Sequence, residues 1–194
     1  MEGNEVKNML SLKDICQKYK VGIWPDKDDV HSYLEVYEEI LAPYRHTAKS
    51  ILEIGLMSGE SLRMWSEYFD GTVYGIDISV KPIDGMADLS KAIFEGYNIK
   101  IGDASNPDDV KKFFNKIKFD VVIEDASHNI EQQLQIYSVL KKYMGKDSIY
   151  IIEDVQDIDN TRSLFENMEG IKKIEIIDRR RIKNRYDDVL VIIS

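Results

Sequence analysis

The chain has 194 residues, 43% hydrophobic and 31% charged, the size of one domain that can bury a sizeable core. Its single cysteine, Cys16, excludes an internal disulfide framework and suits a reducing compartment. The balance of 35 acidic against 26 basic residues gives a net charge of −9, which disfavours binding to nucleic acid or anionic lipid. No apolar run reaches the roughly 18 residues of a membrane span, and no signal peptide is evident. We therefore expect a cytoplasmic protein without nucleic-acid or membrane partners.

The first part of the chain is predicted to be helical. Apolar residues recur at helical spacing over residues 12–19 and again over residues 30–41, and a loop containing Gly and Pro separates the two helices. We interpret residues 1–48 as a helical extension, or lid, packed over the open end of a sheet. Residues 49–194 are expected to form one compact domain.

From residue 50 onward, short apolar strands alternate with helices. In chain order we expect strand 50–54, helix 61–69, strand 72–76, an irregular stretch 79–92, strand 98–101, a helix beginning at Asn106 and Pro107, strand 119–123, helix 130–143, strand 148–152, helix 158–168, and strands 173–177 and 189–193. This alternation predicts an α/β fold with a mainly parallel, seven-stranded sheet and helices on both faces. The last two strands are too close in sequence for a helical crossover, so we expect a C-terminal antiparallel hairpin.

A glycine-containing turn follows the first strand. Glu53, Gly55 and Gly59 form an E-x-G-x-x-x-G pattern that leads into a helix, where backbone N–H groups are free to bind a ligand. Asp77 ends the second strand, where an acid can bind ribose hydroxyls, and Asp103 follows the third, where it can meet an adenine amino group. The absence of the G-x-G-x-x-G spacing favours a nucleoside without pyrophosphate. The alternative is an ordinary turn with solvated acids.

Acidic residues also follow the fourth and fifth strands. Asp125, Glu153 and Asp154 are expected to converge, because the carboxyl ends of neighbouring parallel strands meet at one edge. An oxygen-only set suits a hard cation such as Mg²⁺, and His128, near that ion, is positioned to act as a general base. The alternative is that Asp125 and Asp154 cap helices. We expect no cysteine or second histidine beside these carboxylates.

Three further features carry weaker predictions. Polar and aromatic residues are frequent just before and within the second helix, among them Trp24, Lys27, Tyr33 and Tyr37. They are interpreted either as a lid over a bound cofactor or as part of an amphipathic helix that buries its tyrosines. His31 and His46, taken singly, are typical of surface or capping residues. The basic residues of the terminal hairpin are interpreted as a solvated loop or as a grip on an acidic acceptor such as a nucleotide-sugar diphosphate; they are Arg179, Arg180, Arg181, Lys183 and Arg185.

The segments ILEIG, GESLRMWSEYF, GTVYGIDIS, VVIEDASH and YIIEDVQ occur in this order, and together they resemble the metal-dependent sugar O-methyltransferases of the macrocin, mycinamicin and rhamnosyl type. The resemblance covers about residues 19–160. It implies a class I, Rossmann-like methyltransferase that uses S-adenosylmethionine and Mg²⁺. By position, the cofactor-binding residues would be Glu53, Gly55, Gly59, Ser61, Asp77, Asp103 and Tyr33. The metal ligands would be Asp125, Glu153 and Asp154, with His128 and Asp125 as catalytic residues.

The resemblance implies methylation of a sugar or glycan hydroxyl, with a deoxyhexose such as rhamnose as the first expectation. Family members commonly read D-D-G-S-H where this chain has Glu124, Asp125, Ala126, Ser127 and His128. The sequence leaves open a catechol-like acceptor, a non-catalytic nucleoside-binding module, a nicotinamide oxidoreductase, and whether the chain forms a homo-oligomer.

Overall fold

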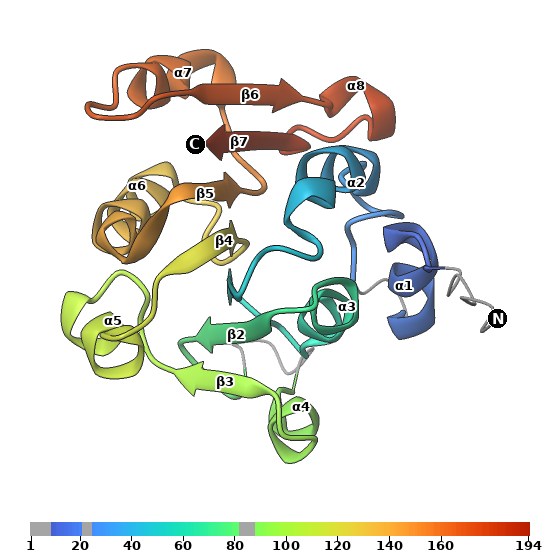
Figure 1. The fold of residues 1–194 in the computed structure, drawn as a ribbon. Helices are drawn as coiled ribbons and strands as arrows, with labels where there is room; N and C mark the ends of the chain where they lie inside the picture. Colours follow the sequence, from blue (N-terminus) through green and yellow to red (C-terminus); the bar gives the residue numbers. More distant parts are fainter. Residues whose placement is uncertain (1–8, 21–24, 82–87) are drawn as a thin grey trace, which may run out of the picture.

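Seven strands form one mixed sheet in the order β3-β2-β1-β4-β5-β7-β6 (Figure 1). The computed structural model describes residues 9–20, 25–81 and 88–194. The strands are β1 Ser50–Ile54, β2 Thr72–Asp77, β3 Asn98–Ile101, β4 Phe119–Glu124, β5 Met144–Ile152, β6 Ile174–Asp178 and β7 Val189–Ile193. The first five pair in parallel, whereas β7 is antiparallel to both β5 and β6. The predicted fold class and the terminal hairpin are confirmed.

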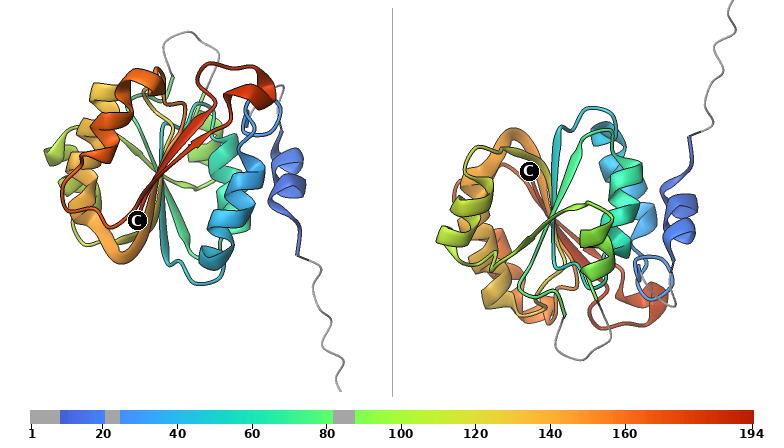
Figure 2. Two further views of the ribbon diagram at one scale, coloured as in Figure 1. Left: turned by 90° about the horizontal axis from the view of Figure 1, so that it is seen from above. Right: turned by 90° about the horizontal axis from the view of Figure 1, so that it is seen from below.

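Helices cover both faces of this sheet (Figure 2). They are α1 Leu12–Tyr19, α2 Leu34–Leu41, α3 Glu60–Tyr68, α4 Ser90–Phe94, α5 Pro107–Phe114, α6 Ile130–Leu140, α7 Ile158–Glu166 and α8 Arg180–Lys183, with 3₁₀ turns at Ala42–Tyr44 and Lys141–Tyr143. Helices α1, α2 and α3 lie on one face, and α5, α6 and α7 lie on the other. Among the described residues, no helix combines the length and the apolar character needed to cross a membrane.

Local sequence explains why the main elements form where they do. The strands β4 and β7 are buried along nearly their whole length, as expected for continuous apolar runs covered on both faces. Asn106 caps α5 by accepting a hydrogen bond from the Asp108 N–H, and Pro107 occupies the first turn, where its missing N–H costs nothing. The prediction of an irregular stretch over residues 79–92 is wrong at its end, because helix α4 begins at Ser90. Residues 82–87 of that stretch lie outside the described residues.

Helix α2 lies beside α3 on one face of the sheet and α1 packs outside them (Figure 2), so the expectation that these helices cover the open end of the sheet is wrong. Helix α1 packs against α3 through an apolar side that includes Leu12 and Ile15, which are buried. Tyr37 of α2 meets Trp65 of α3 edge to face, with 5.2 Å between ring centroids. The segment 25–33, which precedes α2, is the part that reaches the carboxyl ends of the strands.

Candidate active site

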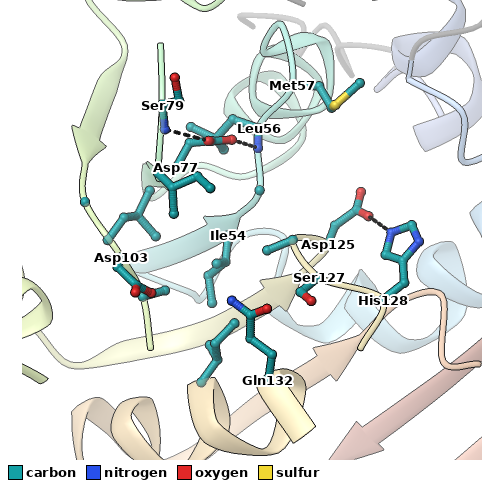
Figure 3. Close-up of a pocket in the computed structure, with 17 residues that line it drawn as sticks. Ile54, Leu56, Met57, Asp77, Ser79, Asp103, Asp125, Ser127, His128 and Gln132 are labelled. Atoms are coloured by element: carbon teal, nitrogen blue, oxygen red, sulfur yellow. Dashed lines mark hydrogen bonds and ion pairs between the residues drawn. The ribbon is translucent and has the colours of Figure 1, made fainter. Parts of the chain in front are cut away.

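A cavity of about 570 Å³ lies outside the carboxyl ends of β1 to β4, where strand order reverses between β1 and β4 (Figure 3). In open α/β sheets this reversal is where ligands bind. The strand ends are tied together there, because Gly55 N–H donates to the Ile76 carbonyl and Asp125 N–H donates to the Ile54 carbonyl. The lining of this cavity includes Gly55, Asp77, Asp103, Asp125, His128 and Gln132.

The glycine turn after β1 is shaped by close approach of two backbone segments. Gly55 has a φ of 82°, and a Cβ atom there would lie 2.1 Å from the Asp125 carbonyl oxygen, so no other residue fits. Gly59 has a φ of 86° and is the N-cap of α3. Glycines therefore stand at both ends of the turn that leads to the first N–H groups of α3, and Leu56, Met57 and Ser58 lie between them.

Two acidic residues line the large cavity at the ends of β2 and β3, where the sequence places them. Asp77 accepts hydrogen bonds from the N–H of Leu56 at 2.8 Å and from that of Ser79 at 3.1 Å, one on each oxygen (Figure 3). The Oδ1 atom of Asp103 accepts from the N–H and the hydroxyl of Ser105. These contacts fix both carboxylates, and each oxygen of Asp77 has a second lone pair to offer a ligand.

Three of the predicted side chains meet where β4 and β5 end. One ligand atom each from Asp125, His128 and Asp154 lies within 4.8 Å of the others. His128 Nε2 is 3.3 Å from Asp154 Oδ2 and 4.0 Å from Asp125 Oδ1. Two carboxylates and an imidazole on one side of a cavity form a donor set that fits a divalent cation with open positions. The three together are called the Asp125–His128–Asp154 group below.

Backbone and burial single out Asp154 within this group. Its φ of 54° is in the left-handed region, which residues other than glycine seldom adopt and which is concentrated at functional sites. Burial, together with the negative charge of Asp125, raises the pKa of Asp154 to about 8. The second of these causes, the repulsion between the two carboxylates, is one that a cation placed beside them would relieve.

The structure does not bring Glu153 into the group. Its carboxylate is buried and accepts hydrogen bonds from Lys27 Nζ at 2.7 and 2.8 Å. The same ammonium donates to Asp125 Oδ2 at 2.7 Å. Burial disfavours the charge on Lys27, but the two carboxylates outweigh that effect and hold its pKa well above the usual value. Part of the charge neutralisation expected from a metal is thus supplied by this chain's own lysine.

Tyr33 and Tyr37 are both fully buried and line neither cavity, and they hold the carboxylates instead of covering a ligand. The Tyr33 hydroxyl donates to Asp154 Oδ1 and the Tyr37 hydroxyl donates to Glu153 Oε1, each at 2.6 Å. Burial raises the pKa of both phenols, which keeps them protonated as donors. The role predicted for Tyr33 in cofactor binding stays a prediction. Trp24 lies outside the described residues.

His31 corrects an expectation, because it is a second histidine beside the carboxylates. It is 2% exposed, and its Nδ1 lies 3.2 Å from Asp154 Oδ1 without making a hydrogen bond. Burial, followed by the charge of Arg185, lowers the pKa of its imidazole. The chain folds back so that residues before the first strand stand at the strand ends, a contact that spacing alone does not reveal. His46, by contrast, is exposed and pairs with Asp70.

A second cavity of about 270 Å³ adjoins the first, and the two share Gly55, Leu56, Met57, Asp125, Ala126 and His128. Its other lining residues are Pro25, Asp26, Lys27, Glu60, Ser61 and Asp154. Ser61, predicted from the sequence, therefore faces this smaller cavity. Burial and the charge of Asp125 raise the pKa of Asp26 to about 6.

Glu53 is fully buried and lines neither cavity. Its Oε1 accepts a hydrogen bond from the Trp65 indole at 3.0 Å, and burial raises the pKa of its carboxyl to about 7. This contact joins the end of β1 to α3, the two elements that the glycine turn connects. Direct contact between Glu53 and a cofactor stays a prediction.

The basic residues of the terminal hairpin are largely paired within the protein. Arg179 donates to Ser32 Oγ and Glu35, Arg180 to Asp159 and Asp178, and Arg185 to Asp187. The Ser32 N–H and hydroxyl in turn donate to Asp188. These contacts clamp the segment 25–33 to the hairpin, which favours a structural role over a grip on an acidic acceptor.

Sequence reasoning missed two residues of the site, Asp26 and Gln132, and considered a third, Lys27, only as part of a cofactor lid. Lys27 and Asp26 come from the N-terminal segment, far along the chain from the strands they face, and Gln132 reaches the large cavity from α6. A lysine within a Pro-Asp-Lys turn carries no local signal that it will be buried. The one usable signal for Gln132 is its place in the first turn of the helix that follows Asp125.

Residues 46–188 match the model of a protein family described as "Methyltransferase domain". The 8-demethyl-8-alpha-L-rhamnosyl tetracenomycin-C 2'-O-methyltransferase of Streptomyces olivaceus is 33% identical over 140 residues, which cover 68% of this chain and 35% of that protein. The demethylmacrocin O-methyltransferase of Streptomyces fradiae is 28% identical, over 74% of this chain and 36% of that protein. The chain thus spans about a third of the length of these curated relatives.

Solved structures show the same fold. The MycE methyltransferase of the mycinamycin pathway, in complex with Mg, SAH and mycinamycin VI, superimposes with a TM-score of 0.70 and 18% identity, covering 96% of this chain and 55% of that chain. An O-methyltransferase from Bacillus cereus in complex with SAH gives a TM-score of 0.65 and 17% identity, covering 95% and 90%. At this level of identity the likeness is evidence of a shared fold.

Proposed function

Because this chain belongs to the family of methyltransferase domains, we propose that it transfers the methyl group of S-adenosylmethionine to a sugar hydroxyl with the help of Mg²⁺. The observation that supports the proposal most directly is that two adjoining cavities share several of their lining residues. Gly55, Asp125 and His128 line both the large cavity and the smaller one. A donor in the first and an acceptor in the second would therefore face each other across the Asp125–His128–Asp154 group.

The larger cavity is proposed to hold S-adenosylmethionine. Asp77 would accept hydrogen bonds from the ribose hydroxyls, and Asp103 would face the adenine amino group, because each carboxylate already stands fixed at a strand end. The glycine turn would let the amino-acid portion approach the backbone. Sequence spacing and cavity position agree on these residues, and both support this orientation of the cofactor.

The Asp125–His128–Asp154 group is proposed to hold the ion and to start the reaction. A bound Mg²⁺ would supply Lewis-acid chemistry that lowers the pKa of the acceptor hydroxyl. Asp125 and Asp154 would hold the ion, and His128, whose side chain is 40% exposed, would accept the hydroxyl proton. Glu153 would act through Lys27 and Tyr37, as a buried counter-charge behind the site.

A sugar ring is the acceptor that we propose, with a deoxyhexose such as rhamnose as the first candidate. Two curated relatives carry rhamnosyl acceptors in their names, and MycE has been solved with mycinamycin VI. The lid role of residues 1–48, a homo-oligomeric state and a cytoplasmic location stay predictions.

The test is methyl transfer from S-adenosylmethionine to methyl rhamnoside, followed by mass spectrometry. We expect a product heavier by one methylene unit when Mg²⁺ is present and no product in excess EDTA, with activity restored by added Mg²⁺. Full activity in excess chelator would remove the ion from the proposal. Binding of S-adenosylhomocysteine without methylation of any glycoside or catechol would favour a non-catalytic nucleoside-binding module.

A further inference from the structure

We propose that Asp26 determines acceptor specificity, by accepting a hydrogen bond from a hydroxyl next to the one that is methylated. This inference rests on the proposed function, since it assigns the smaller cavity to the acceptor ring. It also commits to a ligand class: a neutral ring with neighbouring hydroxyl groups, and not a sugar that places a phosphate or carboxylate in this cavity.

The backbone around Asp26 is held firmly at the strand ends. Its carbonyl accepts hydrogen bonds from the N–H groups of Val30 and His31, at 3.1 and 2.9 Å. The next residue, Lys27, is anchored by its contacts with Asp125 and Glu153. The backbone that carries the Asp26 carboxylate is therefore held in place beside the cavity, as a specificity residue requires.

The Asp26 side chain keeps accepting capacity for a ligand. It is 18% exposed and lines the smaller cavity with Asp125, His128 and Asp154. Among the described residues, the basic group within 4 Å of it is His31, whose Nε2 lies 3.9 Å from Oδ2, beyond hydrogen-bond distance. The ammonium of Lys27 is directed to two other carboxylates. An ionised carboxylate offers several lone-pair sites, and sugar hydroxyls are suitable donors for them.

The size and charge of the cavity define the class of acceptor. A volume of about 270 Å³ is below the roughly 300–1,000 Å³ of pockets that enclose drug-sized ligands, so it suits one small ring with the rest of a larger molecule outside. Four acidic residues line this cavity, Asp26, Glu60, Asp125 and Asp154, together with one lysine, Lys27. An anionic group would be repelled there, whereas a polyol would find acceptors for its hydroxyls.

The experiment compares Asp26→Asn and Asp26→Ala with the wild-type protein and with a matched control, Asp29→Asn. Asp29 is nearby in sequence but pairs with Lys20 and lines neither cavity. Binding of methyl rhamnoside is measured by calorimetry in saturating S-adenosylhomocysteine and Mg²⁺, and KM and kcat are measured separately. We expect the Asp26 variants to weaken rhamnoside binding and raise KM roughly 10–100-fold, which is the usual worth of a hydrogen bond to a charged group. Affinity for S-adenosylhomocysteine and for Mg²⁺ should stay unchanged.

A second comparison varies the ligand as well as the protein. Deoxy analogues of methyl rhamnoside, each lacking one hydroxyl, are tested with the wild-type protein and with Asp26→Ala. One analogue, which lacks a hydroxyl other than the one that is methylated, should bind to the wild-type protein about as weakly as methyl rhamnoside binds to Asp26→Ala. Asp26→Ala should bind this analogue and methyl rhamnoside with equal affinity. The wild-type protein should also bind rhamnose phosphate at least tenfold more weakly than methyl rhamnoside.

Several results would overturn the inference. These are equal rhamnoside affinity in Asp26→Asn and wild type, a loss of Mg²⁺ affinity that assigns Asp26 to the ion, tighter binding of the phosphorylated sugar, or no binding of any neutral glycoside. A wild-type protein that binds the rhamnoside but transfers no methyl group contradicts the proposed function instead, and the comparison of binding affinities still decides the role of Asp26.

Discussion

Lys27 offers the most direct test of how this site is held together. Its ammonium is fully buried and donates to three carboxylate oxygens of Asp125 and Glu153, at 2.7 to 2.8 Å. In Lys27→Met the side chain keeps a similar length but loses the charge. Two carboxylates, one of them 2% exposed, would then face each other without a counter-ion. We expect this variant to be strongly destabilised.

The magnitude follows from the burial of the pair. Removing one partner of a buried ion pair costs about 3–5 kcal/mol, because the other charge stays buried without compensation. For a chain of this size each kcal/mol lowers Tm by about 2–4 °C. The variant should therefore unfold roughly 6–20 °C below the wild type. Adding Glu153→Gln should recover part of the loss, since it removes the uncompensated charge.

Thermal unfolding followed by circular dichroism, without added metal, measures both effects. Lys18→Met serves as the control, because Lys18 also makes a short ion pair, with Glu67, but on the surface. We expect its Tm to change little. If Lys27→Met unfolds within 1–2 °C of the wild type, or if Glu153→Gln deepens the loss, the account of Lys27 as the counter-charge of this site is refuted.

Two further predictions concern the glycine turn and its surroundings. Asp77→Ala should weaken binding of S-adenosylhomocysteine by roughly 1.5–3 kcal/mol, the cost of a lost hydrogen bond to a charged group; calorimetry showing unchanged affinity would contradict the ribose assignment. Glu53→Gln should keep the hydrogen bond from Trp65 while removing the titration. Because burial raises the pKa of Glu53 to about 7 from a usual 4.5, the stability it contributes is complete below 4.5 and is lost as pH rises towards 7. Urea unfolding should therefore show the wild type losing stability relative to the variant across that window, and parallel pH profiles would refute the assigned pKa.

The sequence predicts the parts of the site that follow from strand order. Asp125 and Asp154 both come at the ends of apolar strands, and neighbouring parallel strands place such residues together. The choice between Glu153 and Asp154 could not be predicted. Strand β5 ends at Ile152, and the left-handed backbone at Asp154 turns the chain just after it. Asp154 therefore lines the smaller cavity while Glu153 binds Lys27, an outcome that only the folded backbone decides.

The contributions of the N-terminal segment were hidden for a different reason. Lys27, His31 and Tyr33 reach the strand ends because the segment is clamped by contacts between Ser32 and Asp188, which are far apart in the sequence. Periodicity and capping report on neighbours along the chain, and they carry no information on such tertiary contacts. The same limit explains why α1 and α2 were expected over the open end of the sheet.

His128 is the residue whose role is most open to experiment, because its Nε2 belongs to a group that could also bind the ion through nitrogen. The proposed base and a metal ligand make different demands. A base must reach the acceptor hydroxyl, and its loss should lower kcat by about 10²–10⁴-fold while Mg²⁺ affinity stays the same. A ligand must hold the ion, so its loss should weaken Mg²⁺ binding first, with kcat recovering at high Mg²⁺ concentration.

The exposure of the three side chains favours the first role for His128. Its side chain is 40% exposed, whereas those of Asp125 and Asp154 are 21% and 5% exposed, so the imidazole stands nearest to an incoming acceptor. We therefore expect His128→Ala to lose kcat that no concentration of Mg²⁺ restores, with unchanged affinity for S-adenosylhomocysteine. The matched control is Asp125→Asn, for which Mg²⁺ affinity should fall. Recovery of wild-type kcat in His128→Ala at high Mg²⁺ would make His128 a ligand and place the base elsewhere, because proton transfer cannot be rescued by filling the metal site.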